Sequence, residues 1–269
     1  MCPKSPGLAE ARHRRTIIVM TPLRKVLLVA ALLSPGRTWC ADAARFQVYV
    51  DVSKTPEAQP YVKPVKALCE EWYPKINVIL FGKDFPLPFN DLHIRFEPKV
   101  ERCDGPNCIE AGGFADENTI QINFGYLGRM KDDYRAMIIH ELAHINQHYK
   151  ESPGTGWLVE GIADYVRHRY FDKDIQPKLR ELDGYRFGGS QVDEQAKLRK
   201  QGYLFGYTIA APFLYWLELR KSQGLLVALN IALRQGSYSP DLFQQHCGAP
   251  LDALWQEFIQ QVADSTKHN

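Results

Sequence analysis

Hydrophobic and polar residues alternate along short stretches in the first half of the chain, a pattern typical of half-buried β-strands. Residues 46–52 show it most clearly, because β-branched and aromatic side chains there alternate with polar ones. Residues 75–81, 92–96 and 119–123 have a similar composition. The pattern therefore predicts four strands over these ranges.

The remaining apolar stretches predict helices. Thr55 followed by Pro56 is typical of a helix start. The predicted helices cover residues 55–72, the stretch from Asp132 or Asp133 as N-cap to the Pro-Gly break at 152–156, and residues 157–170, 203–221, 225–233 and 251–262. Residues 172–202 are charged and rich in glycine, and give no clear prediction. Together the elements predict an α+β protein, in which a small mixed sheet and its N-terminal helix pack on a helical C-terminal half.

Residues 1–43 have the layout of a secretory signal peptide, in which basic residues precede a short apolar run at 26–33. Small residues at Ala41 and Ala43 fit a cleavage site, so we expect an exported chain, secreted or periplasmic, whose mature form begins near Ala44. Residues 1–19 precede this pattern, so either Met20 is the true start, which we favour, or the basic leader is unusually long. The apolar run is shorter than the roughly 18 residues of a spanning helix, so stable membrane insertion is not expected. Residues 44–269 are long enough for a single domain.

Removal of this leader changes the charge of the protein. The full chain has a net charge of +2, with 33 Lys and Arg and 31 Asp and Glu. Residues 1–43 contain seven of the former and two of the latter, which leaves 26 basic and 29 acidic residues, or about −3. This balance gives no reason to expect nucleic acid or an anionic membrane as a partner.

Four of the six cysteines, Cys69, Cys103, Cys108 and Cys247, follow the leader. An even number of cysteines in an exported protein indicates disulfides, and four cysteines allow three pairings. The turn-rich stretch between Cys103 and Cys108 can close on itself. We favour that pair, which leaves Cys69 to pair with Cys247.

The sequence His140-Glu141-Leu142-Ala143-His144 places two histidines one helical turn apart on the same face. Two imidazole nitrogens so placed can bind one Zn²⁺, and Glu141 can accept a proton from a water that the metal activates. The alternative is a chance match by two solvated histidines. Apolar neighbours predict a largely buried helix, where unpaired imidazoles would be costly, so we favour a metal site.

Glu160 lies 16 positions after His144, which leaves room for a turn and an antiparallel helix. We predict Glu160 as the third zinc ligand, because a tetrahedral catalytic site uses three protein ligands and one open position. Asp164 follows one turn later, where a carboxylate can accept the free N–H of a liganding imidazole. Gly161 lets the two helices approach closely. The alternative is an exposed acidic face, which apolar neighbours such as Trp157 disfavour.

The other histidines show no ligand spacing, and we expect His148, His93, His168 and His246 at the rim or on the surface. Tyr207 can donate its phenol to a developing oxyanion. From the residues alone, a core aromatic in an apolar helix is the simpler interpretation of that tyrosine.

These motifs resemble those of the plant and bacterial basic secretory protein family, a group of zinc peptidases of the gluzincin type. The similar segments are residues 48–56, 70–74, 120–123 with Tyr126, 140–147, 160–167, and 206–207 followed by 213–214. The resemblance implies a zincin-like fold and peptide-bond hydrolysis. It also implies one catalytic zinc on His140, His144 and Glu160, with Glu141 as general base and Tyr207 as oxyanion donor.

The family also implies that the strand at 119–123 offers its edge to an extended substrate. Two features depart from the family pattern: the chain after the leader is not basic, and the Cys103–Cys108 loop has no counterpart in it.

We therefore expect an exported zinc metallopeptidase that acts on a peptide or protein. Two alternatives stay open, namely a catalytically silent zinc-fold protein that binds peptide or cell-wall material, and a zinc hydrolase of non-peptide amides. Glu141 argues against the silent protein, because metal retention does not require it. The cleavage preference, the physiological substrate and the oligomeric state are not predicted.

Overall fold

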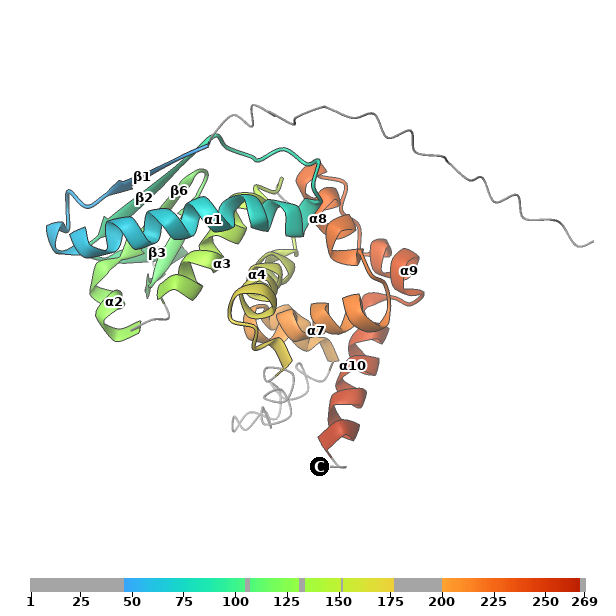
Figure 1. The fold of residues 1–269 in the computed structure, drawn as a ribbon. Coiled ribbons are helices and arrows are strands. Elements are labelled where there is room, and N and C mark those ends of the chain that lie inside the picture. Colours follow the sequence, from blue (N-terminus) through green and yellow to red (C-terminus); the bar gives the residue numbers. More distant parts are fainter. Residues whose placement is uncertain (1–45, 105–106, 131–133, 151, 177–199, 267–269) are drawn as a thin grey trace, which may run out of the picture. The chain divides into compact units, whose positions relative to one another are not determined.

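The computed structural model describes residues 46–104, 107–130, 134–150, 152–176 and 200–266 (Figure 1). The predicted leader, the predicted N-cap at Asp132 or Asp133 and most of the 172–202 segment lie outside these residues. Within the described part of the chain, no helix has the length and apolar character needed to cross a membrane.

Four strands form the main sheet, in the order β1 (Gln47–Asp51), β2 (Asp91–Glu97), β6 (Thr119–Asn123) and β5 (Gly113–Asp116). β1 pairs with β2 and β2 with β6 in parallel, whereas β5 pairs with β6 antiparallel. The mixed sheet and three of the four predicted strands are therefore confirmed. Apolar and polar residues alternate along these strands because every second side chain faces the core. Those buried side chains are Val48, Leu92, Ile94, Phe96, Ile120 and Ile122.

The predicted strand at residues 75–81 is wrong, because these residues are the last two turns of helix α1 (Val62–Phe81). A short 3-10 helix, η1 (Pro56–Tyr61), precedes it. Ile76 and Leu80 are fully buried while Val78 is 42% exposed, so burial follows the helical period. Asn77 is also buried, and its amide donates to the Phe85 carbonyl at 2.6 Å.

A separate hairpin is formed by β3 (Val100–Asp104) and β4 (Asn107–Ala111), and a disulfide joins Cys103 to Cys108. This disulfide was predicted. The predicted partner pair is wrong, because Cys69 and Cys247 are both free thiols. Cys69 lies on α1 with its side chain fully buried in the core, and this burial raises the pKa of its thiol to about 12.

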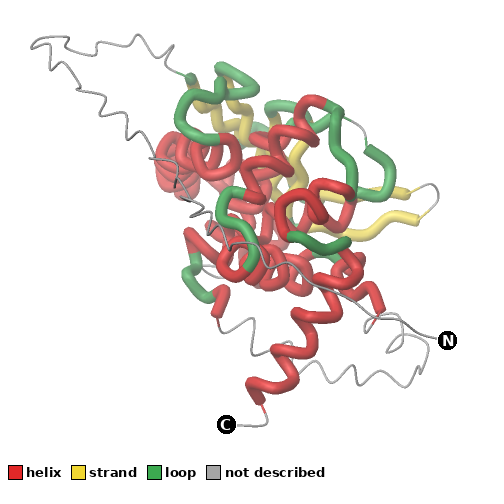
Figure 2. The backbone as a smooth tube through the Cα atoms, turned by 90° about the vertical axis from the view of Figure 1, so that its right-hand side faces the viewer, coloured by secondary structure: helices red, strands yellow, loops and turns green. Residues whose placement is uncertain are grey.

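Helices make up most of the described chain, as Figure 2 shows in red. After η1 and α1 come α2 (Phe124–Met130), α3 (Tyr134–Gln147), α4 (Gly156–Val166) with its π-helical extension η3 (Arg167–Phe171), the 3-10 helix η4 (Gly202–Phe205), α7 (Tyr207–Arg220), α8 (Leu225–Gln235), α9 (Asp241–Cys247) and α10 (Leu251–Thr266). The predicted helix at 203–221 is divided at Gly206, and α2 and α9 were not predicted.

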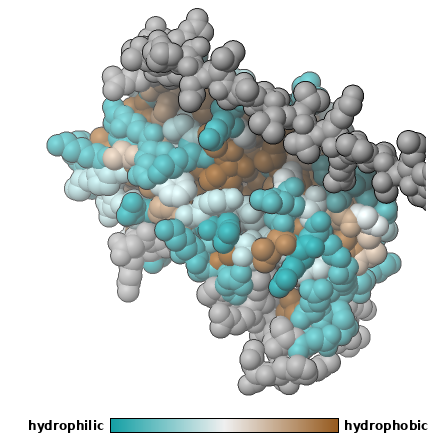
Figure 3. Space-filling view, turned by 45° about the vertical axis from the view of Figure 1, so that its right-hand side comes forward, coloured by the Kyte–Doolittle hydropathy of each residue, from teal (hydrophilic) through white to brown (hydrophobic). Residues whose placement is uncertain are grey.

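Helix α3 connects the sheet with the helical half, because it contacts β5 and β6 of the sheet as well as α1 and α4. Helix α4 in turn packs closely on α7, and a Cβ added at Gly161 would lie 2.6 Å from the Ala210 Cβ. Gly161 was expected to face α3, and this is wrong, because the close approach that it permits is to α7. Polar side chains cover most of the face in Figure 3, and hydrophobic ones gather in a recess near its middle.

Candidate metal centre and catalytic cleft

The His-Glu-x-x-His motif lies on α3, whose apolar neighbours are buried as expected. Ile139 and Leu142 have no exposed surface, so they hold the helix against the core. His140 and His144 project from the same face with ring centroids 4.7 Å apart. The helix therefore presents both imidazoles together to one cleft.

Three potential ligand atoms converge where α3 faces α4. The Nε2 atoms of His140 and His144 are 3.0 Å apart. Oε2 of Glu160, on α4, lies 3.2 Å from Nε2 of His140 and 3.3 Å from Nε2 of His144. These three residues form a group that could hold a metal ion.

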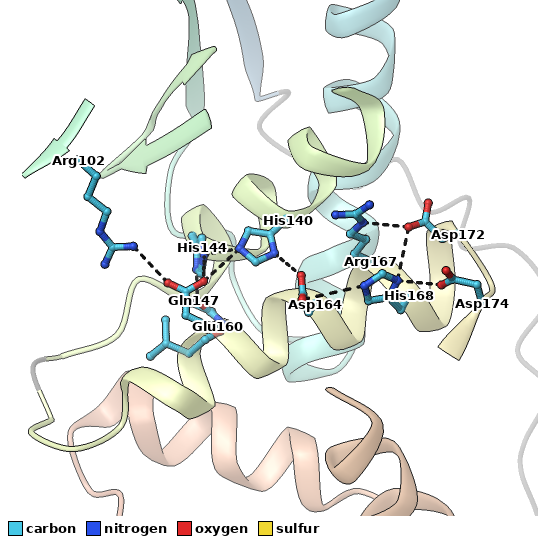
Figure 4. Close-up of polar contacts among 11 residues, drawn as sticks. Arg102, His140, His144, Gln147, Glu160, Asp164, Arg167, His168, Asp172 and Asp174 are labelled. Carbon is cyan, nitrogen blue, oxygen red and sulfur yellow. Dashed lines mark hydrogen bonds and ion pairs between the residues drawn. The ribbon is translucent and has the colours of Figure 1, made fainter. Parts of the chain in front are cut away.

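Hydrogen bonds on the far side of each ring fix the protonation of both imidazoles (Figure 4). Nδ1 of His140 lies 2.7 Å from Oδ1 of Asp164, and a carboxylate only accepts. Nδ1 of His144 lies 2.8 Å from Oε1 of Gln147, whose own amide nitrogen donates to the Val159 carbonyl at 2.8 Å. Both Nδ1 atoms therefore carry the hydrogen, and in the neutral rings both Nε2 atoms present lone pairs.

The result is a group of three acceptors, two Nε2 atoms and one carboxylate oxygen, that point at one another. Such a group requires a cation or a shared proton between its members. A tetrahedral Zn²⁺ with bonds of about 2.0–2.1 Å holds its ligand atoms about 3.3–3.4 Å apart. The observed separations of 3.0 to 3.3 Å are close to this value. The donor set and its spacing therefore fit zinc.

Without a metal, a proton takes the place of the cation. Burial alone lowers the pKa of His140, but the hydrogen bonds with Asp164 and Glu160 outweigh it and raise the pKa to about 10. Burial raises the pKa of Glu160, and here too the hydrogen bonds, with His140 and His144, outweigh it and hold the pKa well below its usual value. Metal binding must therefore displace a proton from this group.

Glu141 lies on the wall of the same cleft and is 8% exposed. It faces β5, because a Cβ added at Gly113 would lie 3.1 Å from the Glu141 Cγ and 2.3 Å from the Met137 sulfur. Gly113 thus lets the strand approach α3 closely beside the ligand atoms.

The cleft has a volume of about 720 Å³ and is bounded by α3, α4, β5 and the β3–β4 hairpin. Residues 113–115 of β5 line it, and β5 is one of the two edge strands of the sheet, with β1 at the other edge. The prediction that residues 119–123 provide the free edge is wrong, because β6 pairs with strands on both sides. The two short strands β5 and β6 adjoin in sequence, and only the pairing shows which one is outermost.

Tyr207 lies at the cleft rather than in the core, and it is 45% exposed. It begins α7, and its ring lies parallel to that of His140 with centroids 6.1 Å apart. Gly206 and Tyr207 have φ values of +66° and +43°, and a positive φ at a bulky aromatic residue is strained. Burial and the charge of Glu160 raise the pKa of the phenol, and Arg102 opposes this. This turn therefore begins α7 with a phenol that lies at the cleft beside His140.

Two residues of this site were missed from the sequence. Gln147 holds His144 from three positions further along α3, a spacing that could have revealed it. Arg102 comes from β3, and its Nη1 lies 3.5 Å from Oε1 of Glu160. No local sequence signal connects β3 with α4.

The expectation that His168 lies on the surface is wrong, since it is 3% exposed. Its Nδ1 lies 2.8 Å from Oδ1 of Asp174 and 3.6 Å from Oδ2 of Asp172, which also pairs with Arg167 at 2.9 Å. Its Nε2 has no hydrogen-bond partner among the described residues, and the Oδ2 atom of Asp164 lies 4.0 Å from it. Figure 4 shows the resulting row of side chains leading from the ligand group along α4 and η3.

The remaining histidines lie where they were expected. His148 and His246 are exposed, and His148 is at the rim of the cleft. His93 is partly exposed and pairs with Asp91 at 2.8 Å.

The fold and the cleft define an α+β protein with a potential His-His-Glu metal group beside a further carboxylate. The family model BSP, described as peptidase of plants and bacteria, matches residues 99–258. The chain belongs to this family, the basic secretory proteins, and the matched residues include every side chain of the ligand group. No curated protein matches the sequence closely enough to indicate relatedness.

Proposed function

We propose that the protein is an exported zinc metallopeptidase that hydrolyses peptide bonds. The observation that carries the proposal is the convergence of Nε2 of His140, Nε2 of His144 and Oε2 of Glu160 at 3.0 to 3.3 Å. This group lies in a cleft of a chain whose family is described as peptidases.

His140, His144 and Glu160 would hold the zinc ion, with Asp164 and Gln147 keeping both imidazoles in the required tautomer. When bound, zinc would lower the pKa of a water molecule and polarise the scissile carbonyl. Each ligand keeps its orientation through an atom that does not face the metal.

Glu141 acts as the general base, because its carboxylate lies in the cleft beside the ligand group. It accepts the proton of the attacking water and delivers it to the leaving amine. The pKa of the Tyr207 phenol is raised, so the phenol is protonated. It donates a hydrogen bond to the oxygen on which negative charge develops.

The edge strand β5 provides the binding surface for an extended peptide or protein substrate. Among the described residues no strand pairs with the outer side of β5, and residues 113–115 line the cleft, so a further strand could pair there. Peptide binding here would place a scissile bond between β5 and the ligand group.

Export is supported by the signal-peptide pattern at residues 1–43 and by the disulfide between Cys103 and Cys108. A cytosolic protein rarely keeps such a bond.

The test is cleavage of an unfolded protein such as casein by the purified protein, with and without a zinc chelator. We expect cleavage that stops with chelator and returns with zinc. Glu141→Gln keeps the shape of the side chain but cannot act as a base, so cleavage should fall by about 10²–10⁴-fold. Equal cleavage by Glu141→Gln and wild type would disprove the assigned mechanism. If the protein cleaves amides of small molecules but no peptide, the non-peptide amide hydrolase is the correct assignment.

A further inference from the structure

Each proposed ligand is held by a second residue through an atom that faces away from the metal position. Asp164 holds His140 at 2.7 Å and Gln147 holds His144 at 2.8 Å. For Glu160, the residue at the free carboxylate oxygen is Arg102. We propose that Arg102 is the positioning residue for Glu160, and that the disulfide-closed β3–β4 hairpin keeps it in place. This inference rests on the proposed zinc site, and not on peptide hydrolysis.

The two oxygens of Glu160 have different surroundings. Oε2 faces the two imidazoles at 3.2 and 3.3 Å, whereas Oε1 faces Nη1 of Arg102 at 3.5 Å (Figure 4). A guanidinium on Oε1 favours the orientation in which only Oε2 turns toward the metal. A single oxygen ligand leaves the fourth zinc position open, as a catalytic site requires.

The hairpin supplies the rigidity that this contact needs. Arg102 directly precedes Cys103, and the disulfide joins Cys103 to Cys108 across the paired strands. At the base of the hairpin Val100 is 2% exposed, so it attaches β3 to the core. An isolated two-stranded hairpin is at best marginally stable in water, so the cross-link restricts where the Arg102 backbone can lie.

The positive charge of Arg102 and its positioning of Glu160 have opposite effects on zinc affinity, and this makes the proposal testable. A cation near a divalent metal repels it, so loss of charge alone would tighten zinc binding. Loss of positioning would weaken it instead. The side chain of Arg102 is 56% exposed, so the ion pair itself contributes little to folding, and the expected effect is on metal affinity.

The experiment measures zinc affinity by competition with a chelator, on folded full-length protein checked by circular dichroism. We expect Arg102→Gln and Arg102→Lys to weaken zinc binding by about tenfold, because lysine keeps the charge but loses the planar fork. Arg129→Gln is the control, because it removes a charge from the other side of the hairpin, where Arg129 pairs with Glu110 at 2.9 Å. Its affinity should stay within about twofold of wild type, as for a screened surface charge.

The disulfide is tested with Cys103→Ser/Cys108→Ser, alone and combined with Arg102→Gln. We expect the double serine variant to weaken zinc binding, and the triple variant to bind no more weakly than Arg102→Gln alone, because both changes remove one interaction. Tighter or unchanged binding by Arg102→Gln, wild-type affinity in Arg102→Lys, or additive losses in the triple variant would overturn the inference. If the wild type binds zinc but cleaves no peptide, only the proposed function fails. If the wild type binds no zinc, both fail.

Discussion

The Nε2 atoms of His140 and His144 face one another at 3.0 Å, while their Nδ1 atoms donate to Asp164 and Gln147. Two neutral imidazoles in these tautomers repel each other at this distance. Oε2 of Glu160 adds a third acceptor to the same space. The arrangement is therefore unfavourable without a cation or a proton, and the following predictions depend on which of the two is present.

Removal of metal should make the stability of the protein depend on pH in a defined window. Because the folded pKa of His140 is raised from 6.5 to about 10, its contribution is fully present below pH 6.5 and is lost as the pH rises toward 10. Because the folded pKa of Glu160 is lowered, its contribution is present above pH 4.5 and is lost as the pH falls further. The metal-free protein should gain most from this group between about pH 4.5 and 6.5.

Urea unfolding of the wild type and of His140→Gln, both with chelator, measures this effect. The difference in unfolding free energy between the two should shrink from pH 6.5 to 10. A constant difference over that range would show that His140 has an ordinary pKa in the folded protein.

Gln147 should affect zinc binding although it does not touch the metal position. Gln147→Met removes the acceptor that fixes the tautomer of His144, so zinc affinity should fall by about 10–100-fold. Chelator competition measures the change, and Gln244→Met on the exposed surface of α9 serves as control. If both variants bind zinc as the wild type does, His144 does not need Gln147.

Tyr207→Phe tests the oxyanion role. Loss of the phenol should lower kcat by about 10²-fold with little change in KM, since the hydrogen bond forms only as charge develops. Zinc content should not change. Tyr126→Phe, also in the cleft, is the control and should change kcat by no more than a few-fold. Equal kcat values for both variants would remove Tyr207 from the mechanism.

Gly161→Ala tests the contact between α4 and α7. The added methyl group would lie 2.6 Å from the Ala210 Cβ, so we expect a loss of about 1–3 kcal/mol in the free energy of unfolding. In the described part of the chain, a new Cβ at Gly128 in α2 meets no atom within 4 Å beyond its own helix, so Gly128→Ala should be neutral or stabilising by up to about 1 kcal/mol. Urea unfolding with zinc present measures both, and equal stabilities would contradict the close packing.

The residues of the ligand group were accessible from the sequence because they lie on two continuous helices. A spacing of four residues on a helix determines that His140 and His144, and likewise Glu160 and Asp164, share a face. Packing of α3 on α4 then brings the pairs together. Local periodicity is sufficient for such an inference.

Other features depend on contacts between distant residues, which periodicity does not contain. Residues 75–81 were predicted as a strand from their apolar and β-branched composition, yet they end a helix in which the polar Asn77 is buried and bonds to Phe85. The edge position of β5 follows from strand pairing, and the approach of Arg102 to Glu160 from the position of the hairpin. His168 was misplaced because the carboxylates that pair with its buried ring, Asp172 and Asp174, come from the segment after η3.

The most direct test of the zinc site is the metal content of two variants that make the same chemical change at neighbouring carboxylates. After dialysis against a weak chelator, Glu141→Gln and Glu160→Gln are compared with wild type by elemental analysis. We predict about one zinc per chain in the wild type and in Glu141→Gln, and far less in Glu160→Gln, because only Glu160 supplies a ligand atom. Full zinc content in Glu160→Gln, or loss of zinc from Glu141→Gln alone, would contradict the site described above.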